Sequence, residues 1–416
     1  MVNLAYGKNI IKFDQTNLSD CDVILPRDCS VITDTPSTLR DIMARPENGA
    51  RLYKLAKGAG RVVILVPDAT RGDHFATLIP VLLDELFKAG LSQKDVSLLI
   101  CGGTHQKVSR QQALKLLGKA AEICPYYIHD ADDADMLVSL GKTEYGTELK
   151  VNRLLKDAFV IGLGIVKHHY YAGYSGGRKI VLPGASARSS IKQNHSRCFL
   201  KDQAKRDPDA INAKLKGNPV HDDMQAASKM VNLAYSVQLV LGPSRKPVGI
   251  FAGSPDEAFT NAVKEADRIS LFEDAQKYQW VIASCGGFPG DMNFLQAHKT
   301  IHHAYSFLKP KGSIIVLAEC SGGMGWDEIV DWAKIGHIPT IIEKLKSSYE
   351  LAGQTTMAML EKAESAKIYL LSSLPEEIVR SLKMIPIKTL DEGLKHLSTI
   401  SGSGAILPQA DLTVHR

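Results

Sequence analysis

The sequence predicts an α/β protein with two α/β domains whose sheets are mostly parallel. A chain of 416 residues is too long for one ordinary hydrophobic core, so two domains are expected. Short β-branched runs alternate with longer amphipathic stretches, which is the pattern of βαβ units. Hydrophobic residues at 44% and charged residues at 23% are typical of a globular chain.

The N-terminal half contains three strand predictions. The run RVVILVPD at 61–68 predicts a buried strand, followed by a helix over 75–90. A second strand is predicted over 95–103, before a helix that ends at Gly118, and a third over 158–166. Because helices separate these strands, they are expected to pair in parallel.

A second α/β block is predicted after residue 270. Its expected segments are strand-like runs at 280–290, 312–320 and 367–373, and a helix from Asn293 to about Leu308. The glycine-rich tail after Ile400 is expected to return to the first domain. The predicted domains are therefore 1–270 with 402–416, and 271–401.

Composition narrows the class of protein. The net charge is only +5, with no lysine or arginine run, which favours anionic small molecules over nucleic acid as partners. No apolar stretch reaches the roughly 18 residues of a membrane span, and the N-terminus has no signal-peptide pattern. Seven cysteines without a CxxC pair fit reduced thiols. We expect a cytoplasmic enzyme that contacts neither nucleic acid nor membrane.

Polar residues follow the three N-terminal strands, where parallel sheets bind their ligands. They are Asp68 and Arg71 after the first strand, Thr104 and His105 after the second, and His168 and His169 after the third. Asp68 and Thr70 also suit the cap of a following turn, whereas Arg71 suits a carboxylate or phosphate contact. His105 is either a surface histidine or a general base.

The segment 162–195 is the most informative part of the chain. His169, Lys179 and His195 are spaced by 10 and 16 residues. The Walker pattern is absent, so Lys179 is a phosphate clamp, a surface lysine or a covalent attachment point for a cofactor. Ser175, Gly176 and Gly177 have backbone N–H groups suited to a phosphate, and an exposed flexible loop is the alternative.

His195 lies in a polar, helix-like stretch. Imidazole is a good ligand for nickel, zinc or iron. One histidine cannot hold a metal ion, so a cofactor would have to provide the remaining ligands.

The second domain has its own candidates. Gln296 and Lys299 share one helix face through their i,i+3 spacing. His298 and His302 have the i,i+4 spacing of a metal pair, but the glutamate of HExxH is missing. We therefore expect His298, His302 and His303 to be solvated or to support other site residues.

Taken together, these motifs resemble the lactate racemase family, enzymes that carry a nickel-pincer nucleotide. The resemblance extends over nearly the whole chain. It consists of D-x-T-R (68–71), G-T-H (103–105), H-x4-Y-S-G-G-x-K (169–179), the downstream His195, and Q-x-x-K (296–299). The shared order and spacing make the match specific.

The resemblance implies a cofactor site. Lys179 resembles the residue joined by a thioamide to the cofactor, the nickel complex of pyridinium-3,5-bisthiocarboxylic acid mononucleotide. His195 resembles the protein ligand of the nickel. Further cofactor contacts are implied for Asp68, Thr70, Ser175, Gly176 and Gly177. The enzymes that make this cofactor are implied partners, and protein from a host without them is expected to lack it.

The resemblance also implies a reaction, the racemisation or epimerisation of a 2-hydroxy acid by reversible hydride transfer to the cofactor. His105 and His169 resemble the two opposed acid/base residues. The implied substrate contacts are Arg71, Gln296 and Lys299, with the site in a cleft between the domains. Leu295 stands where lactate-specific members tend to have an aromatic residue, so the substrate is lactate or a larger relative.

Two other interpretations remain open from the residues. Lys179 also suits a Schiff-base racemase of the pyridoxal-phosphate type, although no partner for the ring nitrogen can be assigned. A non-catalytic protein that binds nickel or a nucleotide would account for Lys179 and His195. It would leave His105 and His169 unexplained.

Overall fold

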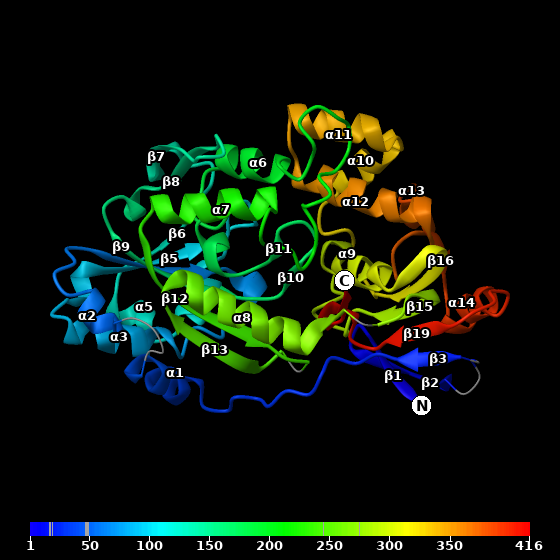
Figure 1. The fold of residues 1–416 in the computed structure, drawn as a ribbon, viewed down its shortest axis with the longest axis horizontal. Helices are drawn as coiled ribbons and strands as arrows, with labels where there is room; N and C mark the ends of the chain where they lie inside the picture. Colours follow the sequence, from blue (N-terminus) through cyan, green and yellow to red (C-terminus); the bar gives the residue numbers. More distant parts are fainter. Residues whose placement is uncertain (16–17, 19, 46–49, 244, 274) are drawn as a thin grey trace. The chain divides into compact units, whose positions relative to one another are not determined.

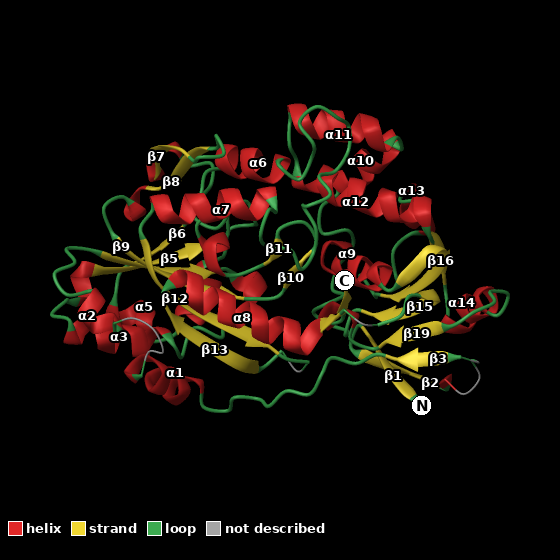
Figure 2. Ribbon diagram, viewed as in Figure 1, coloured by secondary structure: helices red, strands yellow, loops and turns green. Residues whose placement is uncertain are grey.

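The computed structural model describes residues 1–15, 18, 20–45, 50–243, 245–273 and 275–416. The chain forms two compact units (Figure 1). The first unit comprises Cys29–Cys198 and Asp207–Arg268, and the second comprises Met1–Asp28, Phe199–Arg206 and Ile269–Arg416. Helices and strands alternate in both (Figure 2). The predicted α/β class with mostly parallel sheets is confirmed.

A six-stranded sheet with the order β13-β12-β9-β4-β5-β6 forms the centre of the first unit. Its strands are β4 (Val62–Pro67), β5 (Val96–Cys101), β6 (Tyr126–Ile128), β9 (Phe159–Ile165), β12 (Leu233–Leu241) and β13 (Pro247–Gly253). Only the pair β12 and β13 is antiparallel. Two antiparallel hairpins accompany the sheet: β7 (Leu137–Lys142) with β8 (Glu148–Asn152), and β10 (His168–His169) with β11 (Gly173–Tyr174).

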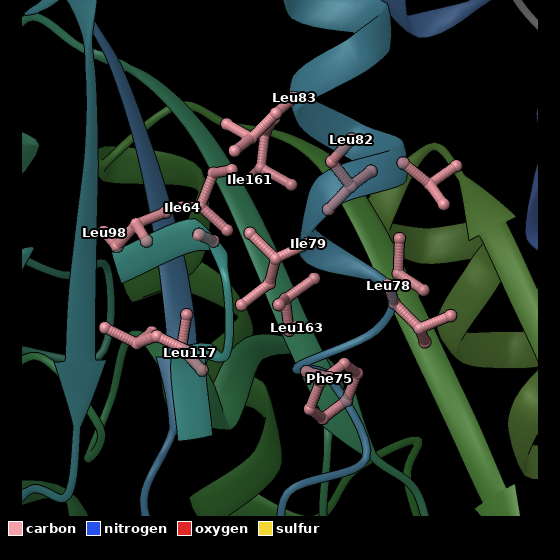
Figure 3. Close-up of a cluster of buried hydrophobic side chains, with 14 of the residues drawn as sticks. Ile64, Phe75, Leu78, Ile79, Leu82, Leu83, Leu98, Leu117, Ile161 and Leu163 are labelled. Atoms are coloured by element: carbon pink, nitrogen blue, oxygen red, sulfur yellow. The ribbon is translucent and has the colours of Figure 1, made fainter. Parts of the chain in front are cut away.

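Helices cover this sheet. They are α1 (Thr35–Ala44), α2 (Leu52–Leu55), α3 (Ile79–Lys88), α4 (Arg110–Leu117), α5 (Ala120–Ile123), α6 (Arg188–Ser196), α7 (Pro219–Met230) and α8 (Pro255–Ser270). All six residues of β4 are buried, as expected for a parallel strand covered on both faces. Figure 3 shows Ile79 and Leu82 of α3 beside Ile64 and Ile161 of the sheet. The helix predicted over 75–90 is shorter in the structure, where α3 spans Ile79–Lys88.

Two glycines in β9 let the 176–180 segment lie close to the face of the sheet that points away from α3. A methyl group on Gly162 would come within 3.0 Å of Ile180. A methyl group on Gly164 would collide with Gln238 and lie 3.1 Å from Gly176. Side chains at these two positions would therefore push the 176–180 segment away from the sheet.

The second unit contains a six-stranded sheet of order β18-β17-β16-β15-β19-β3, in which all neighbours are parallel. Its strands are β3 (Cys21–Val23), β15 (Tyr278–Ser284), β16 (Leu308–Leu317), β17 (Lys367–Leu371), β18 (Ile385–Ile387) and β19 (Gly404–Leu407). Two small pairs accompany it: β1 (Val2–Tyr6) with β2 (Asn9–Phe13), and β14 (Leu271–Phe272) with β20 (Val414–His415). Its helices are α9 (Phe294–Ser306), α10 (Glu328–Ile335), α11 (Ile338–Ser347), α12 (Leu351–Ser365), α13 (Glu376–Ser381) and α14 (Leu390–Leu397).

The two ends of the chain differ from the predicted domain boundaries. The tail strand β19 pairs with β15 and β3, so residues 402–416 belong to the second unit instead of returning to the first. Residues 1–28 also belong to the second unit. A four-residue strand carries too little periodicity to reveal its partner from sequence.

Within the described residues, no helix is both long enough and apolar enough to cross a membrane.

Candidate active site

Neighbouring strand ends bring Asp68 and His105 together. β4 and β5 pair in parallel, so the residues that follow them share one edge of the sheet. His105 Nδ1 lies 2.7 Å from Asp68 Oδ2. The Asp68 side chain is buried, whereas about 41% of the His105 side chain is exposed. His105 is therefore held by a carboxylate while its ring remains accessible.

Asp68 serves two purposes at this point. Its Oδ1 accepts hydrogen bonds from the backbone N–H of Thr70 at 3.2 Å and from the Thr70 hydroxyl at 2.5 Å. Burial opposes ionisation of the carboxyl, but the hydrogen bond and charge of His105, the Thr70 hydrogen bond and the charge of Arg71 lower its pKa. The predicted cap is present, and the same carboxylate holds the histidine.

Arg71 ends the short turn that Asp68 caps. Its Nη1 donates to Thr70 Oγ1 at 3.1 Å, and the side chain is partly buried. The Thr70 hydroxyl thus joins Arg71 to Asp68.

The hairpin of β10 and β11 separates the roles of the two adjacent histidines. His168 is buried, and its Nε2 lies 2.9 Å from Asp267 Oδ1. His169 accepts the backbone N–H of Ala172 at Nδ1, at 3.3 Å, and its Nε2 lies 3.3 Å from Lys179 Nζ. Of the two, His169 is the one that contacts the candidate cofactor lysine.

Lys179 occupies a 3-10 turn, Gly177–Ile180, that packs on β9. Removal from water, with the positive charges of Arg178 and Arg71 nearby, lowers its pKa well below the ordinary value of 10.5. A depressed pKa favours the neutral amine, which is the nucleophilic form.

His195 lies near the end of α6 and is only 3% exposed. Burial, followed by the nearby charges of Lys179 and His105, lowers its pKa well below 6.5. The Tyr171 ring lies 5.5 Å from the His195 ring and 5.7 Å from the Lys179 amine, so these three side chains form one cluster. The neutral imidazole that results is the form that binds metal ions.

The described residues contain no group of three or more histidine, cysteine, aspartate or glutamate side chains arranged to hold a metal ion. A metal at His195 would therefore take its other ligands from a bound molecule.

Ser175 and Gly177 are occupied within the protein. The Ser175 N–H donates to Lys167 O at 2.8 Å, and its hydroxyl donates to Ile165 O at 2.8 Å. The Gly177 N–H donates to Gln238 Oε1 at 2.8 Å. A side chain at Gly177 would also collide with Phe259. These residues hold the loop against the sheet, and both N–H groups are donated to acceptors within the protein.

Gln296 and Lys299 lie together in the first turns of α9, in the second unit. Asn293 Oδ1 accepts the Gln296 N–H at 3.0 Å and caps the helix. Lys299 Nζ donates to Gln296 Oε1 at 2.8 Å. The predicted common helix face is present, and the two side chains form a partly buried polar pair.

The three histidines further along α9 are buried, with exposures of 3%, 8% and 7% for His298, His302 and His303. Of the two alternatives, solvated side chains are therefore excluded, and a role in supporting other site residues stays a prediction. Burial lowers the pKa of His298 to about 3, so this ring is neutral at ordinary pH.

Three supporting residues were missed from the sequence. Asp267 accepts hydrogen bonds from His168 and from the Tyr174 hydroxyl, at 2.9 and 2.7 Å. Asn194 contacts His195 at 3.0 Å, and Asp223 contacts Asn194 at 2.8 Å. Asn194 could have been suspected because it directly precedes His195. No local signal marks Asp223 or Asp267, because each meets its partner only through the tertiary fold.

Comparison with known families gives two matches. The model of the lactate racemase N-terminal domain matches residues 6–207, and that of the lactate racemase C-terminal domain matches residues 273–410.

Curated proteins and solved structures agree with these matches. A lactate racemase of Thermoanaerobacterium thermosaccharolyticum is 29% identical over 409 residues, which cover 96% of this chain and 94% of that protein. A lactate racemase of Lactiplantibacillus plantarum is 28% identical over 69% of this chain and 67% of that protein. The lactate racemase apoprotein structure from T. thermosaccharolyticum superposes with a TM-score of 0.88, with 28% identity, over 100% of this chain and 99% of that one. A Thermotoga maritima protein shares the fold at a TM-score of 0.66 and 17% identity, over 94% and 100% of the two chains.

Proposed function

Because this chain belongs to the lactate racemase family, we propose that it racemises or epimerises a 2-hydroxy acid with a nickel-pincer nucleotide joined to Lys179. Its relatives support assignment to the isomerases, as a racemase. The observation that carries the finer proposal is the cluster of Lys179 with two histidines of different kinds. Its amine lies 3.3 Å from the partly buried ring of His169 and 5.7 Å from the Tyr171 ring, which lies 5.5 Å from the buried ring of His195.

The residues fit this cofactor. A thioamide link needs an unprotonated lysine amine, and the surroundings of Lys179 favour that form. A nickel ligand must be a neutral imidazole, and His195 is buried and neutral. Since one histidine cannot complete the coordination of a metal, the carbon and sulfur ligands of a pincer suit this site. When bound, the cofactor supplies a reversible acceptor for the hydride on the substrate Cα.

The chain's own residues handle the proton of the substrate hydroxyl. Inversion requires an acid/base group for each enantiomer, and His105 and His169 are two candidates carried by different strand ends. Asp68 orients the His105 ring through its contact with Nδ1. His169 is oriented by the Ala172 N–H. Each histidine is proposed to serve one enantiomer: it takes the hydroxyl proton when that enantiomer reacts and returns a proton when that same enantiomer forms.

Substrate binding follows from charge. Arg71 carries a guanidinium suited to a carboxylate, and its link to Thr70 fixes one of its nitrogens. Gln296 and Lys299 are proposed as further contacts to the carboxylate or hydroxyl. Leu295, immediately before Gln296, is aliphatic where an aromatic ring is expected in lactate-specific members, so the proposed substrate is lactate or a larger 2-hydroxy acid.

Intact mass and peptide mapping test the cofactor assignment. The protein is produced together with the enzymes that make the nickel-pincer nucleotide, beside the variants Lys179→Ala and Lys156→Ala. Lys156 is an exposed lysine of the same unit and serves as the matched control. A nickel-containing adduct is expected on the Lys179 peptide in the wild type and the control, and none in Lys179→Ala.

An unmodified Lys179 in protein produced with the complete pathway would contradict the tether. Visible absorbance that borohydride removes would then support the Schiff-base racemase, for which a lysine with a lowered pKa is also suited.

A further inference from the structure

The amide of Asn194 connects His195 to a buried carboxylate. His195 Nδ1 lies 3.0 Å from Asn194 Oδ1. The Nδ2 of Asn194 donates to Val220 O at 3.1 Å and to Asp223 Oδ2 at 2.8 Å. Both Asn194 and Asp223 are fully buried.

Asp223 is itself held from several sides. It accepts the hydroxyls of Thr143 and Thr147 at 2.5 and 2.8 Å, and Arg197 Nε lies 3.1 Å from it. These donors come from two separate segments of the first unit, the turn between β7 and β8 and the end of α6. The carboxylate therefore occupies a fixed position and acts as an acceptor toward Asn194.

This network decides which way the Asn194 amide points. Its NH2 group faces two acceptors, the Val220 carbonyl and the Asp223 carboxylate. The reversed orientation would place the amide oxygen against both acceptors and leave two buried acceptors without a donor, which is costly. The amide oxygen must therefore face His195.

An oxygen that faces Nδ1 requires a proton on that nitrogen. A neutral imidazole carries one proton, so a proton on Nδ1 leaves the lone pair on Nε2. We propose that Asn194, held in place by Asp223, is a positioning residue that fixes His195 in the Nδ1–H tautomer and thereby makes Nε2 the metal-binding nitrogen. This inference rests on the proposed function, because it concerns the ligand of the proposed nickel cofactor. Outer-shell hydrogen bonds of this kind orient metal-binding histidines.

A second asparagine–histidine pair in the same unit has the opposite arrangement. His129 Nε2 lies 3.0 Å from the Ser186 carbonyl, and its Nδ1 lies 3.3 Å from the Asn152 amide nitrogen. The carbonyl requires a proton on Nε2, so His129 is assigned the Nε2–H tautomer. His129 and Asn152 are also buried, which makes the pair an internal reference.

The tautomers are measured by NMR on cofactor-free protein labelled with ¹⁵N only at histidine. Long-range ¹H–¹⁵N correlations distinguish protonated from unprotonated ring nitrogens, and His195→Gln and His129→Gln assign the two sets of signals. We expect His195 to be protonated at Nδ1 and His129 at Nε2. A wild-type His195 protonated at Nε2 overturns the inference, and this result does not depend on any variant folding.

Two matched variants test the role of the amide. Asn194→Ala is expected to abolish the single-tautomer signal of His195 and leave that of His129, whereas Asn152→Ala is expected to leave His195 unchanged. In loaded protein, Asn194→Ala is expected to weaken nickel retention by about 10- to 100-fold, measured as metal released to a chelator while the organic adduct stays on Lys179. Unchanged nickel retention and an unchanged tautomer in Asn194→Ala would contradict the proposal.

The outcome is separate from that of the proposed function. The tautomer is determined without the cofactor. Failure of Lys179 to take up the adduct would therefore contradict the cofactor assignment and leave the tautomer assignment standing.

Discussion

His105 and His169 are proposed to perform the same chemistry, yet the fold surrounds them differently. His105 follows a strand end, is about 41% exposed on its side chain, and has a buried carboxylate 2.7 Å from Nδ1. His169 lies on a two-residue hairpin strand, accepts a backbone N–H at Nδ1, and faces the Lys179 amine. One ring is supported by a carboxylate and the other by a single backbone N–H.

The difference concerns which ring nitrogen carries the proton. A carboxylate beside Nδ1 accepts a proton carried on that nitrogen, whereas an N–H donated to Nδ1 requires a lone pair there, so a neutral His169 ring carries its proton on Nε2. The following changes test that contrast.

Removal of the imidazole of His105 or of His169 should produce the largest loss of activity. His105→Ala and His169→Ala are each expected to lower kcat/KM by about 10²- to 10⁴-fold, the usual contribution of a general acid/base. For a substrate with one stereocentre the enantiomers have equal free energies, so kcat/KM must fall equally in both directions. Polarimetry or chiral chromatography of loaded protein measures this, with the exposed His337→Ala as control. If one of the two variants keeps full activity, the assignment of a pair is wrong.

Removal of the charge behind His105 should produce a smaller loss. Asp68→Asn is expected to lower kcat by about 10- to 150-fold, the value of a hydrogen bond to a charged group. The amide keeps the shape of the side chain but removes the charge that holds the His105 ring. Initial rates with each enantiomer across pH provide the readout. A variant with the wild-type pH profile would contradict the proposed role of the carboxylate.

Asp68→Asn should also change how the free energy of unfolding depends on pH. The folded protein lowers the pKa of Asp68 below 3.8, so its ionised form stabilises the fold at pH values above about 4 and loses this effect as pH falls. The stability difference between wild type and Asp68→Asn should therefore shrink on acidification. Urea denaturation at several pH values measures the difference, and a gap that widens toward low pH would contradict the shift.

Lys179, which faces His169, should have the opposite effect on stability: near neutral pH it should destabilise the folded protein. The fold lowers the pKa of this lysine well below 10.5, so near neutral pH the unfolded chain binds a proton that the native state holds less firmly. Wild-type stability should rise with pH up to about 10.5. Lys179→Met should therefore be more stable than cofactor-free wild type at pH 7, with the gain shrinking toward alkaline pH. Thermal melts over this range check it, and a less stable variant at pH 7 would contradict it.

The smallest effect is expected from Tyr174→Phe. The Tyr174 hydroxyl donates to Asp267, which also contacts His168. Its loss should cost about 1 to 2 kcal/mol of stability and less activity than Asp68→Asn, because His168 still anchors the hairpin. Urea denaturation and initial rates provide both values. A larger loss of activity than in Asp68→Asn would contradict the prediction that the contact behind His105 matters more than the contacts behind the His168–His169 hairpin.

The sequence predicts the proposed site residues better than the residues that hold them in place. The strand ends after 61–68 and 95–103 placed Asp68 and His105 at one sheet edge, and their hydrogen bond follows from that pairing. The spacing from His169 to Lys179 favoured His169 over His168, and the structure brings His169 to that lysine.

The supporting contacts depend on tertiary structure. Asp223 reaches Asn194 from α7, and Asp267 reaches His168 from α8, at sequence separations that no local pattern encodes. The internal hydrogen bonds of the Ser175 and Gly177 N–H groups could not be predicted for a related reason. Their acceptors, Lys167 O and Gln238 Oε1, become adjacent to them only in the folded unit. The short strand β19 was placed wrongly because its partners are distant in sequence.

The fate of the substrate Cα hydrogen tests the central claim most directly. Loaded protein is allowed to racemise an optically pure 2-hydroxy acid in D2O, and the product is analysed for deuterium at Cα by NMR. The account predicts full retention of the original hydrogen, because the histidines exchange only the hydroxyl proton with solvent. Deuterium at Cα would show that a side chain removes this hydrogen as a proton, and the proposed roles of His105, His169 and Lys179 would have to be abandoned.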